Sequence, residues 1–266
     1  VFQEVAALQN EFQAETAHLF PLARPTIWFP PSLYGAQHLS HTRSWNQRFD
    51  LFHVIHSVLH PFPFLRLLKQ PVVYTVAASV QPAYELKTLP LAGIHTVVTS
   101  NERDRDMLEC LGRPPSVMIR PGIDTTRFQA VPPPPGDPFT LLVGAAPWTA
   151  AQFTSKGIVA LLDAAVAMKD IRLVFLWRGL HRDILQALIA ARGLDDRCEI
   201  IDGAADVPVV LTRCHAAVVL AATRKLVKAY PHSLLEALAA GRPVLASDTL
   251  CIADHITKTG CGVAVK

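Results

Sequence analysis

The sequence is constrained most by a regular alternation of short apolar runs and amphipathic stretches between residues 139 and 265. The apolar runs predict strands at Phe139–Val143, Ile171–Trp177, Cys198–Asp202, Ala216–Ala221, Val244–Ser247 and Gly262–Val265. The stretches between them predict helices at Gly157–Met168, His181–Arg192, Val207–Cys214 and His232–Ala240, and a helical turn at Ala253–Thr257. Apolar strands that alternate with helices are typical of a parallel sheet covered on both faces. Ligands of such sheets bind beyond the carboxyl ends of the strands.

A proline-rich run, VPPPPGDP at Val131–Pro138, comes just before this alternation. Four consecutive prolines fit neither a helix nor a central strand. We interpret the run as a stiff connector between two domains, one at about residues 1–130 and the other at 139–266.

The first 130 residues carry a weaker form of the same alternation. Apolar spacing predicts a helix within residues 1–18, and a second at Asn101–Leu111 with Ser100 or Asn101 as its N-cap. Runs rich in β-branched residues predict strands at Leu51–His56, Val72–Val76 and Thr96–Thr99, and a further short strand is expected at Thr26–Phe29.

Composition narrows the classes of function. Half of the residues are apolar and 18% are charged, which predicts a folded core rather than disorder. No apolar run reaches the roughly 18–20 residues that a membrane span requires. The five cysteines contain no C-x-x-C pair, and we interpret them as reduced, buried thiols of a cytoplasmic protein without a metal site. The net charge of +3 fits an anionic ligand or an anionic membrane surface, and no basic tract with interleaved aromatics indicates nucleic acid.

The richest candidate site is the loop that leads into the helix predicted at His232–Ala240. Its sequence, RKLVKAYPHS at 224–233, brings three cations, among them Lys228, to a helix N-terminus beyond a strand. Helix N-termini and cations bind anions such as diphosphates, whereas the alternative is a solvated loop with ordinary capping. Glu236 fits two roles, as an acceptor of hydrogen bonds from sugar or ribose hydroxyls or as a capping-box partner of Ser233.

Other polar residues also follow predicted strands. Lys156 precedes the helix at Gly157 and could reach a phosphate, and Arg178 follows the strand that ends at Trp177. Both have the alternative of an ordinary surface role. His53 and His56 lie near the end of a predicted strand and are the candidates for a catalytic or acceptor-binding role, against the alternative of packed histidines.

Several segments, taken in order, resemble the retaining glycosyltransferases of family 4, the group 1 type. The segment VVTSNERDRDMLECLG…MIRPGIDTTRF (97–128) resembles the hinge side of that family, PHSLLEALAAGRPVLAS (231–247) its donor-site signature, and ADHITKTGCGVAV (253–265) its tail. LLVG…SKGIVALLDAA…IRLVFLWRG (141–179) is similar to the opening of its donor domain, and DLFHVIHS…KQPVVYTVAAS (50–79) to the late part of its acceptor domain.

The resemblance implies an α/β protein of GT-B architecture, with two Rossmann-like parallel-sheet domains facing a cleft. It implies transfer of a hexosyl group from a nucleotide diphosphate sugar to a hydroxyl acceptor with retention, without a metal. Lys156 matches the family's phosphate-contacting lysine, Gly144 its first-strand glycine, and Glu236 the carboxylate that usually holds the ribose. The pyrophosphate-binding helix start falls on His232, Ser233, Leu234 and Leu235, and the edge that meets the base falls on Gly203 and Ala204.

The chain departs from the family at four points. Lys228 stands at the first carboxylate of the E-x7-E motif, Ala145 at an arginine, and Ala77 at the acceptor-domain histidine. The loop AAPWTAAQFTS (145–155) is longer than usual. The family's opening strand and closing helices have no counterpart in this sequence, so the first domain is expected to be incomplete. Lys228 or Arg178 would restore the cation lost at Ala145.

The expected donor is a UDP-sugar or a GDP-sugar, and the expected acceptor is a saccharide, a lipid-linked molecule or a small molecule. A cytoplasmic location is expected, with peripheral contact at the inner membrane face left open. Two alternatives remain. A nucleotide-sugar epimerase on the same scaffold would need no acceptor. A catalytically degenerate relative would bind nucleotide sugar without turnover, which the residues at Ala77, Ala145 and Lys228 favour.

Overall fold

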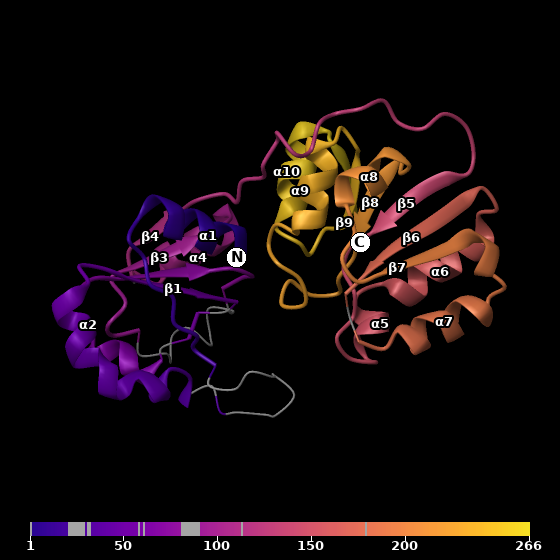
Figure 1. Cartoon of the computed structure of the whole chain (residues 1–266). Helices are drawn as coiled ribbons and strands as arrows, with labels where there is room; N and C mark the ends of the chain where they lie inside the picture. Colours follow the sequence, from indigo (N-terminus) through magenta and orange to yellow (C-terminus); the bar gives the residue numbers. More distant parts are fainter. Residues whose placement is uncertain are drawn as a thin grey trace. The chain divides into compact units, whose positions relative to one another are not determined.

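The computed structural model describes residues 2–20, 30, 33–57, 59–60, 62–80, 91–112, 114–178 and 180–266, with side chains from residue 5 onward. The strand expected at Thr26–Phe29 lies outside these residues. The chain divides into two compact units, Val1–Arg120 and Pro121–Lys266 (Figure 1).

The second unit is built on a six-stranded parallel sheet with the order β10-β9-β8-β5-β6-β7. Its strands are β5 (Phe139–Val143), β6 (Ile171–Trp177), β7 (Cys198–Asp202), β8 (Ala216–Val219), β9 (Val244–Ser247) and β10 (Gly262–Val265). The predicted strands are confirmed, and the one that begins at Ala216 ends earlier than predicted, at Val219. Because β5 lies between β8 and β6, its carboxyl end is central to the edge where a ligand is expected.

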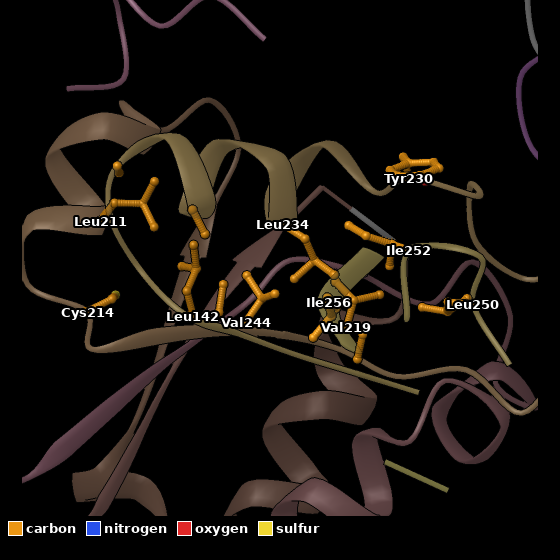
Figure 2. Packing of buried hydrophobic residues seen from close by; sticks show 14 of the residues in the cluster. Leu142, Leu211, Cys214, Val219, Tyr230, Leu234, Val244, Leu250, Ile252 and Ile256 are labelled. Carbon is orange, nitrogen blue, oxygen red and sulfur yellow. The ribbon is translucent and has the colours of Figure 1, made fainter. Parts of the chain in front are cut away.

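Helices cover both faces of this sheet (Figure 1). One face carries α5 (Gln152–Ser155), α6 (Ile158–Ala167) and α7 (Arg182–Ala190), and the other carries α8 (Val207–Thr212), α9 (His232–Ala239) and α10 (Ile252–Thr259). The pleat sends successive side chains to opposite faces. Leu142 therefore packs with Leu234 and Ile256 on the α8–α10 face (Figure 2), while its neighbours Leu141 and Val143 pack against α6 and α7.

The first unit contains a four-stranded parallel sheet, in the order β1-β2-β3-β4, among the residues that the structure describes. The strands are β1 (Phe52–His56), β2 (Val72–Val76), β3 (Thr96–Thr99) and β4 (Ser116–Met118). The helices are α1 (Phe2–Glu11), α2 (Thr42–Arg48) and α4 (Glu102–Cys110), with short 3-10 turns at Ala36–His41 and Pro63–Leu67. The helix predicted within residues 1–18 ends at Glu11, and β4 and α2 were not predicted.

A buried polar network joins the carboxyl ends of β2 and β3 in this unit. Asn101 caps α4, as predicted, by accepting a hydrogen bond from the Asp104 amide at 2.9 Å. The Asp104 carboxylate in turn accepts from the Ser79 hydroxyl at 3.0 Å, the Val80 amide at 3.1 Å and the Asn101 side chain at 2.9 Å. This network fixes the segment that follows β2, because each buried polar group has a partner.

The segment before the proline run belongs to the second unit. Phe128 is buried among the side chains of the α8–α10 face. Gly241 adopts a φ of 74° and lies so close to Ala130 that a Cβ added at Gly241 would be 3.3 Å from the Ala130 Cβ. The boundary therefore falls at Arg120–Pro121. The predicted first domain, 1–130, includes residues 121–130, which lie in the second unit, because composition shows a stiff connector but not what the connector packs against.

Arg242 is the side chain that binds the proline run to the second unit. It is 1% exposed and donates to the carbonyl of Leu211 at 3.1 Å, of Val131 at 2.7 Å and of Pro132 at 3.0 Å. Leu211 lies in the last turn of α8, where the helix dipole favours a cation. The backbone at Gly241 ends α9 and presents Arg242, whose amide donates to Ala237 O at 2.8 Å in the manner of a Schellman motif.

Replacing Arg242 should loosen this attachment. We expect Arg242→Met to lower the free energy of unfolding by about 3 kcal/mol, because three carbonyls lose a charged donor. Urea denaturation of the purified chain measures the change. The matched control is Arg182→Met, whose guanidinium is 47% exposed and pairs with Asp202 at 3.4 Å, and which should cost less than about 1 kcal/mol. Equal effects of the two substitutions would contradict the assignment.

Candidate functional site

The candidate site lies at the carboxyl edge of the second unit's sheet, where β5 meets the start of α9. Gly144 directly follows β5, and a Cβ added there would lie 2.4 Å from Ser233 Cβ and 2.5 Å from Ser233 Oγ. Only glycine allows this approach. The predicted residues Gly144 and Ser233 are therefore brought together, and the N-terminus of α9 is held against the end of β5.

The first turn of α9 leaves few amides for an anion. Pro231 is the N-cap, and its carbonyl accepts from the amides of Leu234 at 3.0 Å and Leu235 at 3.2 Å. An anion at this helix start would therefore be met by the Ser233 amide ahead of them. Ser233 is the second helical residue and makes no capping hydrogen bond, so the capping-box alternative for Glu236 is wrong.

Lys156 ends the loop that follows β5 and is buried. Its side chain is 5% exposed, and its amine donates to the carbonyl of Ala146 at 2.9 Å. None of the ion pairs among the described residues includes Lys156. Burial lowers the pKa of this amine. A buried ammonium group with a carbonyl as its acceptor gains most from the arrival of an anion, which supplies both charge and a hydrogen bond.

Glu236 lies on α9 as a half-buried carboxylate beside two arginines. Burial raises the pKa of the Glu236 carboxyl, and the charges of Arg178 and then Arg127 partly offset that rise. The sequence pointed to Arg178 but not to Arg127. Arg127 is held in a turn in which Asp124 accepts from the Thr126 amide at 3.0 Å, next to buried Phe128. The aspartate and phenylalanine of that turn were visible in the sequence, but the packing that brings the arginine to Glu236 was not.

The remaining predicted donor-site residues lie at several points of the same edge. Lys228 is half-buried in the loop between β8 and α9. Gly203 follows β7 with a φ of 86°, its amide donates to Trp177 O at 3.1 Å, and Ala204 beside it is exposed. Since β6 lies between β5 and β7, these two residues stand apart from Gly144 along the edge.

The two candidate catalytic histidines of the first unit are not brought together. Both lie on β1, three positions apart, so the pleat directs their side chains to opposite faces. The His53 imidazole Nε2 is 2.7 Å from Thr75 Oγ1. His56 instead packs its ring edge-to-face on Phe62, with ring centroids 5.2 Å apart, at the carboxyl end of the strand. The backbone carbonyl of His56 accepts from the Ala77 amide at 2.7 Å, so His56 lies beside the position where the resembled family has its histidine.

His60 is a histidine near His56 that sequence reasoning set aside. Burial lowers the pKa of His60, and the neighbouring His56 lowers it further. The His60 ring stacks obliquely on Phe62 at 4.9 Å, and its amide donates to the Tyr74 hydroxyl at 3.2 Å. His56 and His60 therefore form a histidine pair around one phenylalanine at the carboxyl edge of the first unit.

The described residues lack the features of a metal site and of a membrane span. They contain no group of three or more His, Cys, Asp or Glu side chains placed to hold a metal ion. None of their helices is both long enough and apolar enough to cross a bilayer. The five cysteines are free thiols, and burial raises the pKa of Cys198 and of Cys214 to about 11. Cys110 is exposed, contrary to the prediction of buried thiols.

Residues 125–266 match the family described as glycosyl transferases group 1. No curated protein matches the chain by sequence.

Solved structures resemble the chain in fold. HepE of Anabaena in complex with UDP matches with a TM-score of 0.67 and 16% identity, over 89% of this chain and 70% of that one. A glycosyltransferase of Rickettsia africae matches with a TM-score of 0.68 and 16% identity, over 98% and 73%. The pneumococcal O-GlcNAc transferase GtfA in complex with UDP and GlcNAc matches with 0.56 and 15%, over 81% and 46%. These likenesses confirm the predicted GT-B architecture of two parallel-sheet domains.

The raised pKa of Glu236 predicts how stability depends on pH. A carboxyl whose folded pKa exceeds its unfolded value of about 4.3 stabilises the fold below that value and loses the contribution as pH rises through the folded pKa. Glu236→Gln lacks this loss. We therefore expect the variant to melt at a higher temperature than the wild type at pH 7 and at the same temperature near pH 4.

Thermal melting between pH 4 and 8, without nucleotide, tests this expectation. Glu109→Gln, at an exposed site on α4, is the control and should follow the wild type. A wild type that is more stable than Glu236→Gln at pH 7 would show that the arginines outweigh burial.

Proposed function

Since this chain belongs to the group 1 glycosyl transferases, we propose that it transfers a hexosyl group from a nucleotide diphosphate sugar to a hydroxyl acceptor, with retention of configuration. The observation that carries the proposal is the state of Lys156. Its amine is buried at the ligand edge of the sheet with the Ala146 carbonyl as acceptor, so an anionic diphosphate is the partner that would complete it. The start of α9, held against Gly144, supplies amides for the same anion.

The charges around this edge suit a departing diphosphate. As the bond between sugar and diphosphate breaks, negative charge accumulates on the diphosphate oxygens. Lys156, Lys228 and the dipole of α9 would stabilise that charge without a metal ion. We assign Glu236 to the ribose hydroxyls, and the charges of Arg178 and Arg127 partly offset the rise that burial gives to its pKa. Lys228 replaces a family carboxylate by a cation, which strengthens the hold on phosphate at the expense of contacts with the sugar hydroxyls.

The nucleotide is proposed from relatives of the same fold. HepE was solved with UDP and with UDP-glucose, and GtfA with UDP and GlcNAc. This supports a UDP-sugar as donor, with a GDP-sugar as the alternative, and a saccharide, a lipid-linked molecule or a small molecule as acceptor. We assign Gly203 and Ala204 to the base, because they form an exposed turn at the same edge. The free thiols fit a reducing compartment, and we propose a cytoplasmic location.

A catalytically degenerate relative is the second candidate, and Ala77 and Ala145 favour it. Ala145 removes a cation beside the phosphates, and Ala77 removes an imidazole at the acceptor side. His56 lies next to Ala77 in the sheet and supplies an imidazole at that edge, which favours a working enzyme. Product analysis separates the candidates: a transferase forms a glycoside with acceptor, a degenerate relative forms none, and an epimerase alters the donor alone.

Removing the Lys156 amine should weaken nucleotide binding without weakening the fold. We expect Lys156→Met to lower the affinity for UDP or GDP by on the order of 10- to 100-fold, the worth of one charge-assisted hydrogen bond. Its melting temperature should be no lower than that of the wild type, because an ammonium whose pKa is lowered by burial costs stability at neutral pH.

Calorimetric titration without divalent metal, paired with thermal melting, measures both quantities. Lys169→Met changes an exposed lysine of the same unit and should bind as the wild type does. A folded Lys156→Met that binds UDP and GDP with unchanged affinity would refute the assignment.

The two histidines of β1 should differ in their effect on transfer. We propose that the His56 imidazole acts as a general acid or base, so His56→Asn is expected to lower kcat by on the order of 10²-fold. His53→Asn should leave kcat unchanged, because His53 faces the other side of the sheet and bonds Thr75. Steady-state transfer assays, with melting curves to exclude misfolding, check this. Equal losses from both substitutions would contradict the assignment of His56.

A further inference from the structure

The loop between β5 and α6 is anchored at both ends to the candidate site. It begins after Gly144, which contacts Ser233 at the start of α9. It ends at Ser155, whose carbonyl accepts from the amide of Ala222, beyond the end of β8, at 2.7 Å. The residues between, 145–155, therefore lie over the carboxyl ends of β5 and β8. This is the loop that is longer than in the resembled family.

This loop is fixed by hydrogen bonds and packing, yet its Trp148 side chain is exposed to solvent. The Gln152 side-chain oxygen accepts from the Trp148 amide at 2.8 Å, and α5 buries Phe153 against Trp177, with ring centroids 5.9 Å apart. Trp148 itself is 59% exposed. An isolated exposed apolar side chain needs no explanation by itself. Here, however, the backbone that presents the indole is tied to the proposed phosphate-binding lysine.

The tie is the hydrogen bond from the Lys156 amine to the carbonyl of Ala146, two residues before Trp148. A diphosphate oxygen is a stronger acceptor for an ammonium group than a peptide carbonyl. A diphosphate that draws the Lys156 amine toward itself moves it away from the Ala146 carbonyl and weakens the hydrogen bond between them. The segment that carries Trp148 then keeps the bond from the Trp148 amide to Gln152 but is held less firmly at Ala146. Occupancy of the diphosphate site and the position of the indole are thus coupled through one hydrogen bond.

We propose that Trp148 is a donor-contacting residue that selects for the sugar, and that Lys156 sets its position. The proposal rests on the proposed function. With diphosphate bound, the indole face packs on the apolar C–H face of the hexosyl ring. The base is a poorer partner, because Gly203 and Ala204 follow β7, which β6 separates from β5. The flat, rigid indole contributes apolar contact at little cost in side-chain entropy.

Calorimetric titration of the whole chain with UDP, GDP, UDP-glucose, UDP-galactose, UDP-GlcNAc and GDP-mannose tests the proposal. The quantity to compare is the ratio of affinities for the tightest nucleotide sugar and for its bare nucleotide. We expect Trp148→Ala to bind the bare nucleotide as the wild type does and to lower that ratio by roughly 3- to 10-fold. Val263→Ala is the matched control, because Val263 is 58% exposed on β10 and should leave the ratio unchanged.

A second measurement, tryptophan fluorescence, reports on the hydrogen bond between Lys156 and Ala146. Tryptophan emission of the wild type should change when the nucleotide sugar binds, and Trp148→Phe should lose that change. In Lys156→Met, the Trp148 contribution to emission should already differ from that of the wild type without any nucleotide, because the bond to Ala146 is absent. Unchanged emission in ligand-free Lys156→Met would overturn the coupling.

The remaining outcomes separate this proposal from the function on which it rests. A wild type that binds nucleotides while Trp148→Ala keeps the affinity ratio overturns the role of Trp148 alone. A wild type that binds none of the six ligands overturns the proposed function, and the role of Trp148 falls with it.

Discussion

The second unit depends on one buried guanidinium. Arg242 lies in the turn that ends α9. Its guanidinium donates hydrogen bonds to the end of α8 and to the first residues of the proline run. Proline-rich chain offers few amides for hydrogen bonding, so its carbonyls need donors from elsewhere. By supplying them, Arg242 fixes the path that leads into β5. Because Gly144 directly follows β5, the same contact helps to set where the candidate site begins.

The candidate site contains one buried cationic side chain, Lys156, and one half-buried acidic side chain, Glu236. The Lys156 amine and the Glu236 carboxyl each have a pKa displaced by burial toward the neutral form. Such groups weaken the ligand-free fold, which the apolar clusters on the two faces of the sheet must offset. Perturbed groups of this kind are typical of binding sites, where a ligand restores the missing interactions. Stability and binding therefore oppose one another at this edge.

The sequence predicted the features that depend on local pattern. Apolar runs indicated every strand of the second unit, and the resemblance directed attention to Lys156, Gly144 and Glu236. The elements β4 and α5, of three and four residues, were not predicted, because such short segments show little apolar periodicity. Arg127 lies beside Glu236 because two segments far apart in the sequence pack together. Local sequence patterns do not predict such a contact. The separation of His53 from His56 followed from strand alternation and could have been predicted.

The early boundary at Arg120–Pro121 has a consequence for chimeric enzymes. The donor specificity of two-domain transferases can in principle be exchanged by fusing halves of different relatives. The proline run is the natural place to cut if only composition is considered. A crossover there would separate Arg242 from its carbonyl partners and leave Phe128 without its pocket. A viable recombination point must instead precede Pro121. The segment 121–138 then comes from the same protein as the second unit, against which it packs.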